Sequence, residues 1–276
     1  MRIIADTATL IPPSEGESRG MTIIPVCVSI DDKTYQDYTQ ISSSEFLDKI
    51  SCGGVPTSSQ PAIGDFLEIL ESTREDVLML TVGDGLSGAY QTAMGARNLV
   101  EDPERVHIVN SKTLAGPLRY LAKKAVVLKN QGLDIEAIQE NLQQCIESSV
   151  SFVIPEDFNF LRRSGRLTPL AAKLGGALKI LPILTQTKDK TRITPLGVKR
   201  SWDGAVEAIV KQLQSLGVGA DHIISVCHAG TPQKAERILQ QIRERFRSSE
   251  TELLELSPAL ITHGGPGCIV IQAIHK

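Results

Sequence analysis

Short apolar runs alternate with amphipathic stretches through the first half of the chain. Runs bounded by turn residues predict four strands, at residues 2–6, 21–30, 76–82 and 105–111. Apolar residues at helical spacing predict helices between them, at residues 43–51, 62–73, 88–100 and 115–132. Because such alternation is typical of a parallel α/β layer, we expect one here. Pro25 lies inside the second run and predicts an edge strand or an irregular one.

The pattern changes near residue 150. From residue 133 we expect a helix at 133–149 and a strand at 150–156. Residues 158–200 would contain a basic turn, an Ala/Gly/Leu-rich helix and a hairpin. A helix at 201–217, a strand at 222–230, a helix at 231–246 and strand material at 250–276 would follow. The predicted fold class is therefore α/β with two domains. Residues 1–150 would form an N-terminal parallel-sheet domain, and residues 151–276 a C-terminal α/β domain with a mixed or antiparallel sheet.

Composition narrows the classes of protein to consider. The chain has 276 residues, 41% of them hydrophobic, 22% charged and 4% aromatic, with a formal net charge of -3. These values are ordinary for a globular protein, and they give no general case for binding nucleic acid or an anionic membrane. The five scattered cysteines contain no CxxC pair, which predicts reduced thiols and a cytoplasmic protein without a zinc site. No apolar run is long enough for a transmembrane segment, and Asp6 interrupts the first run, which predicts a strand there and not a signal peptide.

Small hydroxylated and acidic residues follow the predicted strands, where an open parallel sheet places its ligands. They are Asp6, Thr7, Thr9, the loop Thr57–Gln60, the turn 83–88 with Ser87, and Asn110 with Ser111. Hydroxyls and helix N-terminal N–H groups suit a carboxylate or a phosphate, although each residue could equally be a local helix cap or turn former. The chain lacks GxxxxGK[ST] and a strand-borne GxGxxG, which excludes the two commonest nucleotide sites.

Near the C-terminus, the sequence ITHGGPGCIVI places His263 before three glycines, a proline and an apolar run. This stretch could be a loop that enters a buried strand. It could also present His263 and bare backbone N–H groups to an anion, because glycine lets other groups approach the backbone closely. We expect His263 to supply a switchable charge there.

Taken in order, these segments resemble the DegV family of bacterial fatty-acid-binding proteins. Eight motifs are similar to those of the family and follow its order over nearly the whole chain: ADTATLIP, IIPVCVSIDDKTYQDY, VPTSSQPAIGDF, GLSGAYQTA, VNSKTLAGPL, FLRRSGRLTP, ALKILPIL and THGGPG. The resemblance implies a two-domain protein with a long-chain fatty acid buried between the domains and no other cofactor. The aliphatic segment 170–184 would help to line the tunnel.

The resemblance also implies roles for particular residues. Hydroxyls and turn residues would hold the acyl carboxylate, with a cation and a histidine close to it: Thr57, Ser58, Ser59, Ser87, Gly88, Arg166 and His263. The chain itself would not be an enzyme. An ATP-dependent kinase subunit would dock near Arg200 and convert the bound acid to acyl phosphate, which an acyltransferase of phospholipid synthesis would then use.

Three departures affect the expected head-group site. Ala62 and Ala89 stand where the family has hydroxyls, and Asp84 adds an acid before Ser87. Two other functions remain open on the residues alone. One is a serine hydrolase using Ser87 and His263 with Asp84 or Asp6, although G-x-S-x-G needs glycine at Ala89. The other is a regulator that binds a sugar or a phosphate.

Overall fold

A computed structural model describes residues 1–173 and 180–276. Its first sheet has the strand order β2-β1-β6-β7, and all neighbouring strands are parallel. The strands are β1 (Arg2–Asp6), β2 (Met21–Ile24), β6 (Val77–Thr81) and β7 (Val106–Asn110). The residues of β1, β2 and β6 are almost all buried because helices cover both faces, so these strands appear in the sequence as continuous apolar runs, whereas β7 at the edge is partly half-buried.

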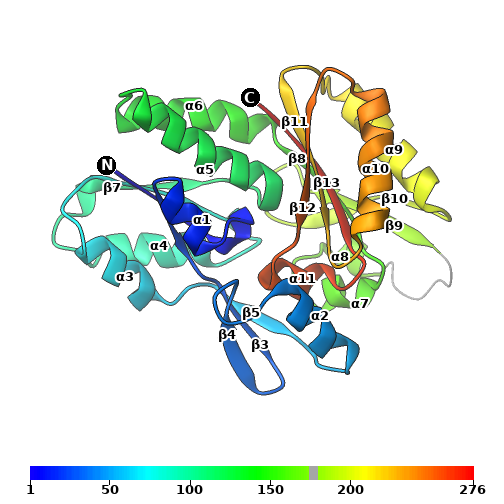
Figure 1. Cartoon of the computed structure of the whole chain (residues 1–276), viewed down its shortest axis with the longest axis horizontal. Helices are drawn as coiled ribbons and strands as arrows, with labels where there is room; N and C mark the ends of the chain where they lie inside the picture. The colour runs from blue at the N-terminus through cyan, green and yellow to red at the C-terminus, as the bar shows by residue number, and fades with distance from the viewer. Residues whose placement is uncertain (174–179) are drawn as a thin grey trace.

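The two faces of this sheet bury alternate residues of each strand. Ile4 and Met79 pack under α3 (Ile63–Glu71) and α4 (Ala89–Arg97). Ile3 and Leu78 pack on the other face under α5 (Ala115–Asn130) and α6 (Ile135–Ser148). Figure 1 shows α5 and α6 side by side over the sheet. The carboxyl ends of the strands therefore lead into loops that meet at one edge.

Pro25 ends the predicted strand 21–30 instead of lying within it. The run divides into β2 and β3 (Cys27–Ile30), and these strands belong to different sheets. Proline has no N–H to donate to a ladder, so the chain leaves the first sheet at this point. β3 pairs with β4 (Lys33–Gln36) and β5 (Thr57–Ser59) in a small antiparallel sheet, and α2 (Ser43–Ser51) lies beside it (Figure 1).

The second large sheet has the order β10-β9-β8-β13-β11-β12. Its strands are β8 (Val150–Ile154), β9 (Leu181–Gln186), β10 (Ile193–Lys199), β11 (His222–His228), β12 (Glu250–Glu255) and β13 (Ile269–His275). β11 and β12 pair in parallel and the other neighbours are antiparallel. Helices α9 (Trp202–Ser215) and α10 (Pro232–Arg245) bury one face. The predicted α/β fold class, with a parallel sheet followed by a mixed one, is confirmed. The boundary between residues 150 and 151 stays a prediction.

Residues 250–276 were expected to be strand material, which is only partly right. Helix α11 (Pro258–Gly264) separates β12 from β13 and begins with Pro258 at its first position. It packs beside α7 (Phe158–Arg163) and α2. The remaining short elements are η1 (Thr7–Thr9), α1 (Pro13–Ser18), η2 (Pro103–Arg105) and α8 (Pro169–Ala172).

Six of the fifteen residues of the predicted tunnel segment 170–184, namely residues 174–179, lie outside the described residues. Its end, Leu181–Leu184, belongs to β9. Over the two described ranges, no helix combines the length and the apolar character needed to cross a membrane.

Gln272 on β13 joins the start of α5 to the second sheet. Its Nε2 donates to Leu114 O at 3.0 Å and to Ser151 Oγ at 2.8 Å, and its Oε1 accepts from Gly116 N at 3.1 Å. The backbone comes this close because Gly116 has no side chain. A Cβ there would lie 2.2 Å from Ser225 Oγ. These contacts hold the strand ends of the first sheet against the second sheet.

Candidate functional site

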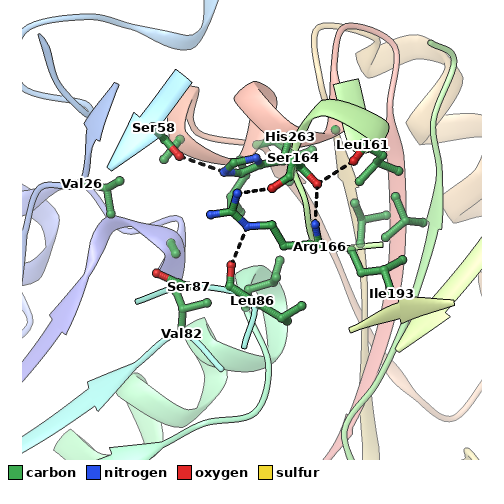
Figure 2. A pocket seen from close by; sticks show the side chains of 18 of the residues that line it. Val26, Ser58, Val82, Leu86, Ser87, Leu161, Ser164, Arg166, Ile193 and His263 are labelled. Atoms are coloured by element: carbon green, nitrogen blue, oxygen red, sulfur yellow. Dashed lines mark hydrogen bonds between the residues drawn. The ribbon is translucent and has the colours of Figure 1, made fainter. Parts of the chain in front are cut away.

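A pocket lies where the two large sheets and the small sheet meet. It has about 900 Å³ of space between its atoms, counting the open mouth. Most of its wall is apolar, and seven polar residues complete it: Ser58, Ser59, Gln60, Ser87, Ser164, Arg166 and His263. Figure 2 shows that Ser58, Ser87, Ser164, Arg166 and His263 come from separate segments of the chain and all border the pocket.

Ser58 and His263 form the first polar contact of the pocket. Ser58 Oγ and His263 Nε2 are 2.8 Å apart (Figure 2). Ser58 lies on β5 and His263 in the last turn of α11, so the contact joins the small sheet to the C-terminal half. Ser59 also lines the pocket, but Thr57 is exposed and does not. The structure therefore brings Ser58 and Ser59, but not Thr57, to the predicted site.

Arg166 supplies the permanent charge of the pocket. Its Nε donates to Leu86 O at 3.0 Å, and its Nη1 donates to Ser164 O. Ser164 is held in turn, because its Oγ donates to Leu161 O at 2.6 Å and accepts from Arg166 N at 3.2 Å. Burial, and then the neighbouring Arg192, lower the pKa of Arg166, but a guanidinium remains charged at neutral pH. Arg166 thus links the turn before α4 to the C-terminal half.

The turn before α4 presents Ser87 to the pocket. Its Oγ accepts a hydrogen bond from Ala89 N at 3.2 Å, which leaves the hydroxyl proton free to turn toward a ligand. Gly88 does not line the pocket. A Cβ at Gly88 would lie 3.1 Å from the Gln60 carboxamide, so glycine lets Gln60 pack over the turn. Gln60 belongs to the loop Thr57–Gln60 that was expected near a ligand, but the head-group residues implied by the family resemblance did not include it.

The prediction that His263 carries a switchable charge at neutral pH is wrong for the pocket as it stands. Burial, and then the positive charge of Arg166, lower the pKa of His263 to about 4. The imidazole is therefore neutral near pH 7 and acts as a hydrogen-bonding partner for Ser58. Gly265, at φ 77°, ends the helix directly behind it, where a Cβ would lie 2.6 Å from the Phe160 ring.

Asp84 and Arg200 lie away from the pocket wall. Asp84 Oδ2 accepts from Gln91 Nε2 at 3.0 Å, and its backbone N–H donates to Asn110 Oδ1 at 3.1 Å. Arg200 is exposed, one residue beyond the end of β10. The expected acid beside the head group is thus turned toward α4. Arg200 stays a prediction for partner docking.

Asp6 and Asp37 are two buried carboxyl groups close to the lining residues Ala8 and Ala259. Asp6 Oδ1 accepts from Ala8 N at 2.9 Å. Within the described ranges, Asp6 Oδ2 and both oxygens of Asp37 have no partner within hydrogen-bonding geometry. Burial raises the pKa of Asp6 to about 6 and that of Asp37 to about 7, and the charge of Asp6 adds to the effect at Asp37. Burial is thus the main cause of both raised pKa values.

The contacts at Ser87 and His263 do not form a hydrolase triad. The partner of His263 Nε2 is Ser58, and Ser87 is bonded to the start of α4. Asp84 is held by Gln91, and Asp6 by Ala8. A nucleophile, a base and an orienting acid in mutual contact are what such catalysis needs. In the described part of the chain, no group of three His, Cys, Asp or Glu side chains is arranged to hold a metal ion either.

Comparison with known proteins gives consistent matches over the full length. A family model described as an uncharacterised protein of the DegV family matches residues 1–276. A DegV domain-containing protein of Clostridium acetobutylicum is 26% identical over 98% of this chain and 96% of its own. A solved structure of a DegV family protein from Thermus thermophilus, described by its fatty-acid binding, is 26% identical and has a TM-score of 0.89 over 100% of both chains. A DegV family protein from Eubacterium eligens, loaded with heptadecanoic acid, shares the fold with a TM-score of 0.87 at 22% identity, over 100% of both chains.

Proposed function

This chain belongs to the DegV family, and we propose that it binds a long-chain fatty acid in the pocket between its sheets. One observation carries the proposal: a pocket with a mostly apolar wall also holds hydroxyls, an imidazole and one guanidinium, and Ser58, His263, Ser164 and Arg166 lie together in it (Figure 2). That arrangement suits a molecule with one anionic end and a long apolar chain. The fatty-acid binding described for the Thermus thermophilus relative supports the same ligand class.

The energetics favour such a ligand. A buried methylene contributes roughly 0.8 kcal/mol, so about 14 of them contribute roughly 11 kcal/mol before the costs of association. The carboxylate must be hydrogen-bonded to stay charged in a buried site. Ser87 Oγ–H, Ser58 Oγ and the Arg166 guanidinium are the groups that would do this. Because His263 is neutral, Arg166 would be the main compensating charge.

We further propose that the bound acid is presented to an ATP-dependent kinase subunit. The kinase would phosphorylate the carboxylate, and an acyltransferase of phospholipid synthesis would consume the acyl phosphate. Negative charge develops during such a transfer, and Arg166 is positioned to stabilise it without adding an exposed cation. The exposed position of Arg200 leaves it available for the docking surface that the family resemblance implies.

The other two functions receive less support. A sugar or a phosphate would leave the apolar wall of the pocket unmatched. A hydrolase using Ser87 would need His263 on Ser87, whereas His263 contacts Ser58. The chain is therefore proposed to be a carrier, with catalysis in the partner.

The direct test is the lipid content of protein produced in bacteria. Organic extraction followed by mass spectrometry should give about one long-chain fatty acid per chain. Delipidated protein should then take up added hexadecanoic acid in the same ratio. Folded protein that contains no fatty acid and takes up none would contradict the proposal. Adding ATP and the kinase subunit tests the second step, with hydroxylamine trapping any acyl phosphate as a hydroxamate.

A further inference from the structure

A smaller cavity adjoins the main pocket on the side of the second sheet. It has about 310 Å³ of space between its atoms, counting open space at its edge. Five apolar residues line both cavities and form a shared waist: Leu86, Leu114, Val153, Ile193 and Val270. The residues that line only the smaller cavity are polar: Ser151, Thr185, Gln186 and Gln272. We call this smaller cavity the end chamber. An apolar passage with a polar end is unexpected if the ligand ends in a methyl group.

Hydrogen bonds already occupy part of the end chamber. Gln272 is fully used, because both its amide hydrogens and its oxygen have partners. Thr185 Oγ1 donates to Ser151 O at 2.9 Å. These contacts hold the strands and the start of α5 in place, and they do not call for a ligand.

Gln186 leaves an acceptor without a donor. Its Nε2 donates to Lys112 O at 2.9 Å and to Lys190 O at 3.3 Å, which fixes the orientation of the amide. Its Oε1 is buried and, within the described ranges, has no hydrogen-bond partner. A buried acceptor of this kind carries a desolvation cost unless a donor reaches it.

Ser151 offers the complementary donor. Its Oγ accepts from Gln272 Nε2 at 2.8 Å, and among the described residues no acceptor is recorded for its own proton. The end chamber therefore combines an unpaired acceptor with an available hydroxyl donor. A single hydroxyl group on a ligand can donate to the first and accept from the second.

We propose that the end chamber selects acyl chains that carry a hydroxyl group near the end remote from the carboxylate, with Gln186 and Ser151 as its specificity-determining residues. This inference rests on the proposed fatty-acid binding, because it assumes that the carboxylate lies at the Ser58–Arg166 end. A plain methyl end in the end chamber leaves Gln186 Oε1 unpaired. A hydroxyl satisfies it and gains a second hydrogen bond.

The test compares two series of ligands on delipidated protein by isothermal titration calorimetry. One series is saturated fatty acids of 12 to 18 carbons, and the other is the same acids with a hydroxyl on the last carbon. At the length that fills both cavities, the hydroxyl should tighten binding about tenfold, as expected for a ligand hydroxyl in a site built to bond it. Hydroxylated acids that bind no tighter than their parents at every length would overturn the inference. Binding of neither series would instead reject fatty-acid binding itself.

Variants assign the preference to the end chamber. Gln186→Leu should abolish the advantage of the hydroxylated acid and leave the parent acid bound at least as tightly. Ser151→Ala, a smaller change that leaves the amide bonds of Gln186 intact, should reduce the advantage by severalfold. Gln240→Leu, on the exposed face of α10, is the matched control and should change neither affinity. A tenfold hydroxyl preference that survives both Gln186→Leu and Ser151→Ala would show that the end chamber is not its source.

Discussion

The two ends of α11 carry ionisable groups that burial affects in opposite directions. Asp37 lies at the N-terminal end, near Ser257 and Ala259, and its pKa is raised from 3.8 to about 7. His263 lies in the last turn, and its pKa is lowered from 6.5 to about 4. The helix dipole would favour an anion at the first end and a cation at the second. Burial outweighs it at both ends, since a helix of seven residues has a weak field and both groups are poorly solvated.

The comparison shows that the pocket is built to keep nearby ionisable groups neutral. With His263 neutral and Asp37 near its midpoint at pH 7, Arg166 is the group whose charge is fixed. An anionic ligand therefore meets one strong partner and several neutral donors. Four predictions test this contrast between the fixed charge of Arg166 and the ionisable groups whose pKa burial shifts.

The largest effect is expected at Asp37. Its raised pKa means that folding favours the protonated form, so its contribution to stability is full below about pH 4 and is lost as the pH rises through about 7. A shift of about three units corresponds to on the order of 4 kcal/mol. The stability of Asp37→Asn relative to wild type should therefore increase by that amount as the pH rises from 4 to 8, measured by urea unfolding. For Asp48→Asn, on the exposed side of α2, the free energy of unfolding should change with pH as it does in wild type. The same pH dependence for Asp37→Asn as for wild type would contradict a raised pKa at Asp37.

His263 should show the opposite slope. Because folding favours neutral imidazole, its contribution to stability is present above pH 6.5 and is lost as the pH falls through about 4. The wild-type chain should lose about 3 kcal/mol more than His263→Gln over that interval. Glutamine can still bond Ser58, and His107→Gln serves as the control. If the difference in stability between wild type and His263→Gln is the same at pH 7 and pH 4, His263 is solvated.

Arg166 tests whether one fixed charge holds the ligand. Arg166→Met should weaken fatty-acid binding by about 1.5–3 kcal/mol, the usual value of a hydrogen bond to a charged group. Arg162→Met, at an exposed position of α7, is the matched control and should bind as wild type. Calorimetry with hexadecanoic acid measures both. Equal affinities, with both variants folded, would show that neutral donors are sufficient.

The smallest effect on the ligand is expected at Arg200. Arg200→Ala should leave fatty-acid affinity unchanged and slow association with the kinase subunit by severalfold, and added salt should produce the same slowing in wild type. Arg247→Ala is an equally exposed control. Surface plasmon resonance at two salt concentrations gives the rates. A kinase affinity equal to wild type would remove Arg200 from the docking surface.

The sequence predicted the elements that are buried on both sides most accurately. β1 and β6 lie within the expected runs, because a strand covered on both faces is a continuous apolar segment. It failed at α11, which is too short for a helical period to be visible and lies between residues typical of turns. At Pro25 the expected edge or irregular strand is found, since β2 lies at the edge of the first sheet, but the sequence did not predict that the chain changes sheets there.

The site was predicted in part. Ser58, Ser59, Ser87, Arg166 and His263 were expected together, and all five line the pocket. What could not be predicted depends on distances between segments far apart in the chain. The neutral state of His263 follows from burial and from Arg166, and the end chamber follows from strands that the sequence does not place side by side.

The hydrogen bonds of Gln272 have a consequence for biosynthesis. The N–H of Gly116 and the carbonyl of Leu114 find their partner 156 and 158 residues later in the chain. When the first half leaves the ribosome, the start of α5 therefore lacks the group that will satisfy it. We expect the first sheet to remain sensitive to protease until β13 has been translated, and ribosome-bound chains truncated before Gln272 to be cleaved near the start of α5.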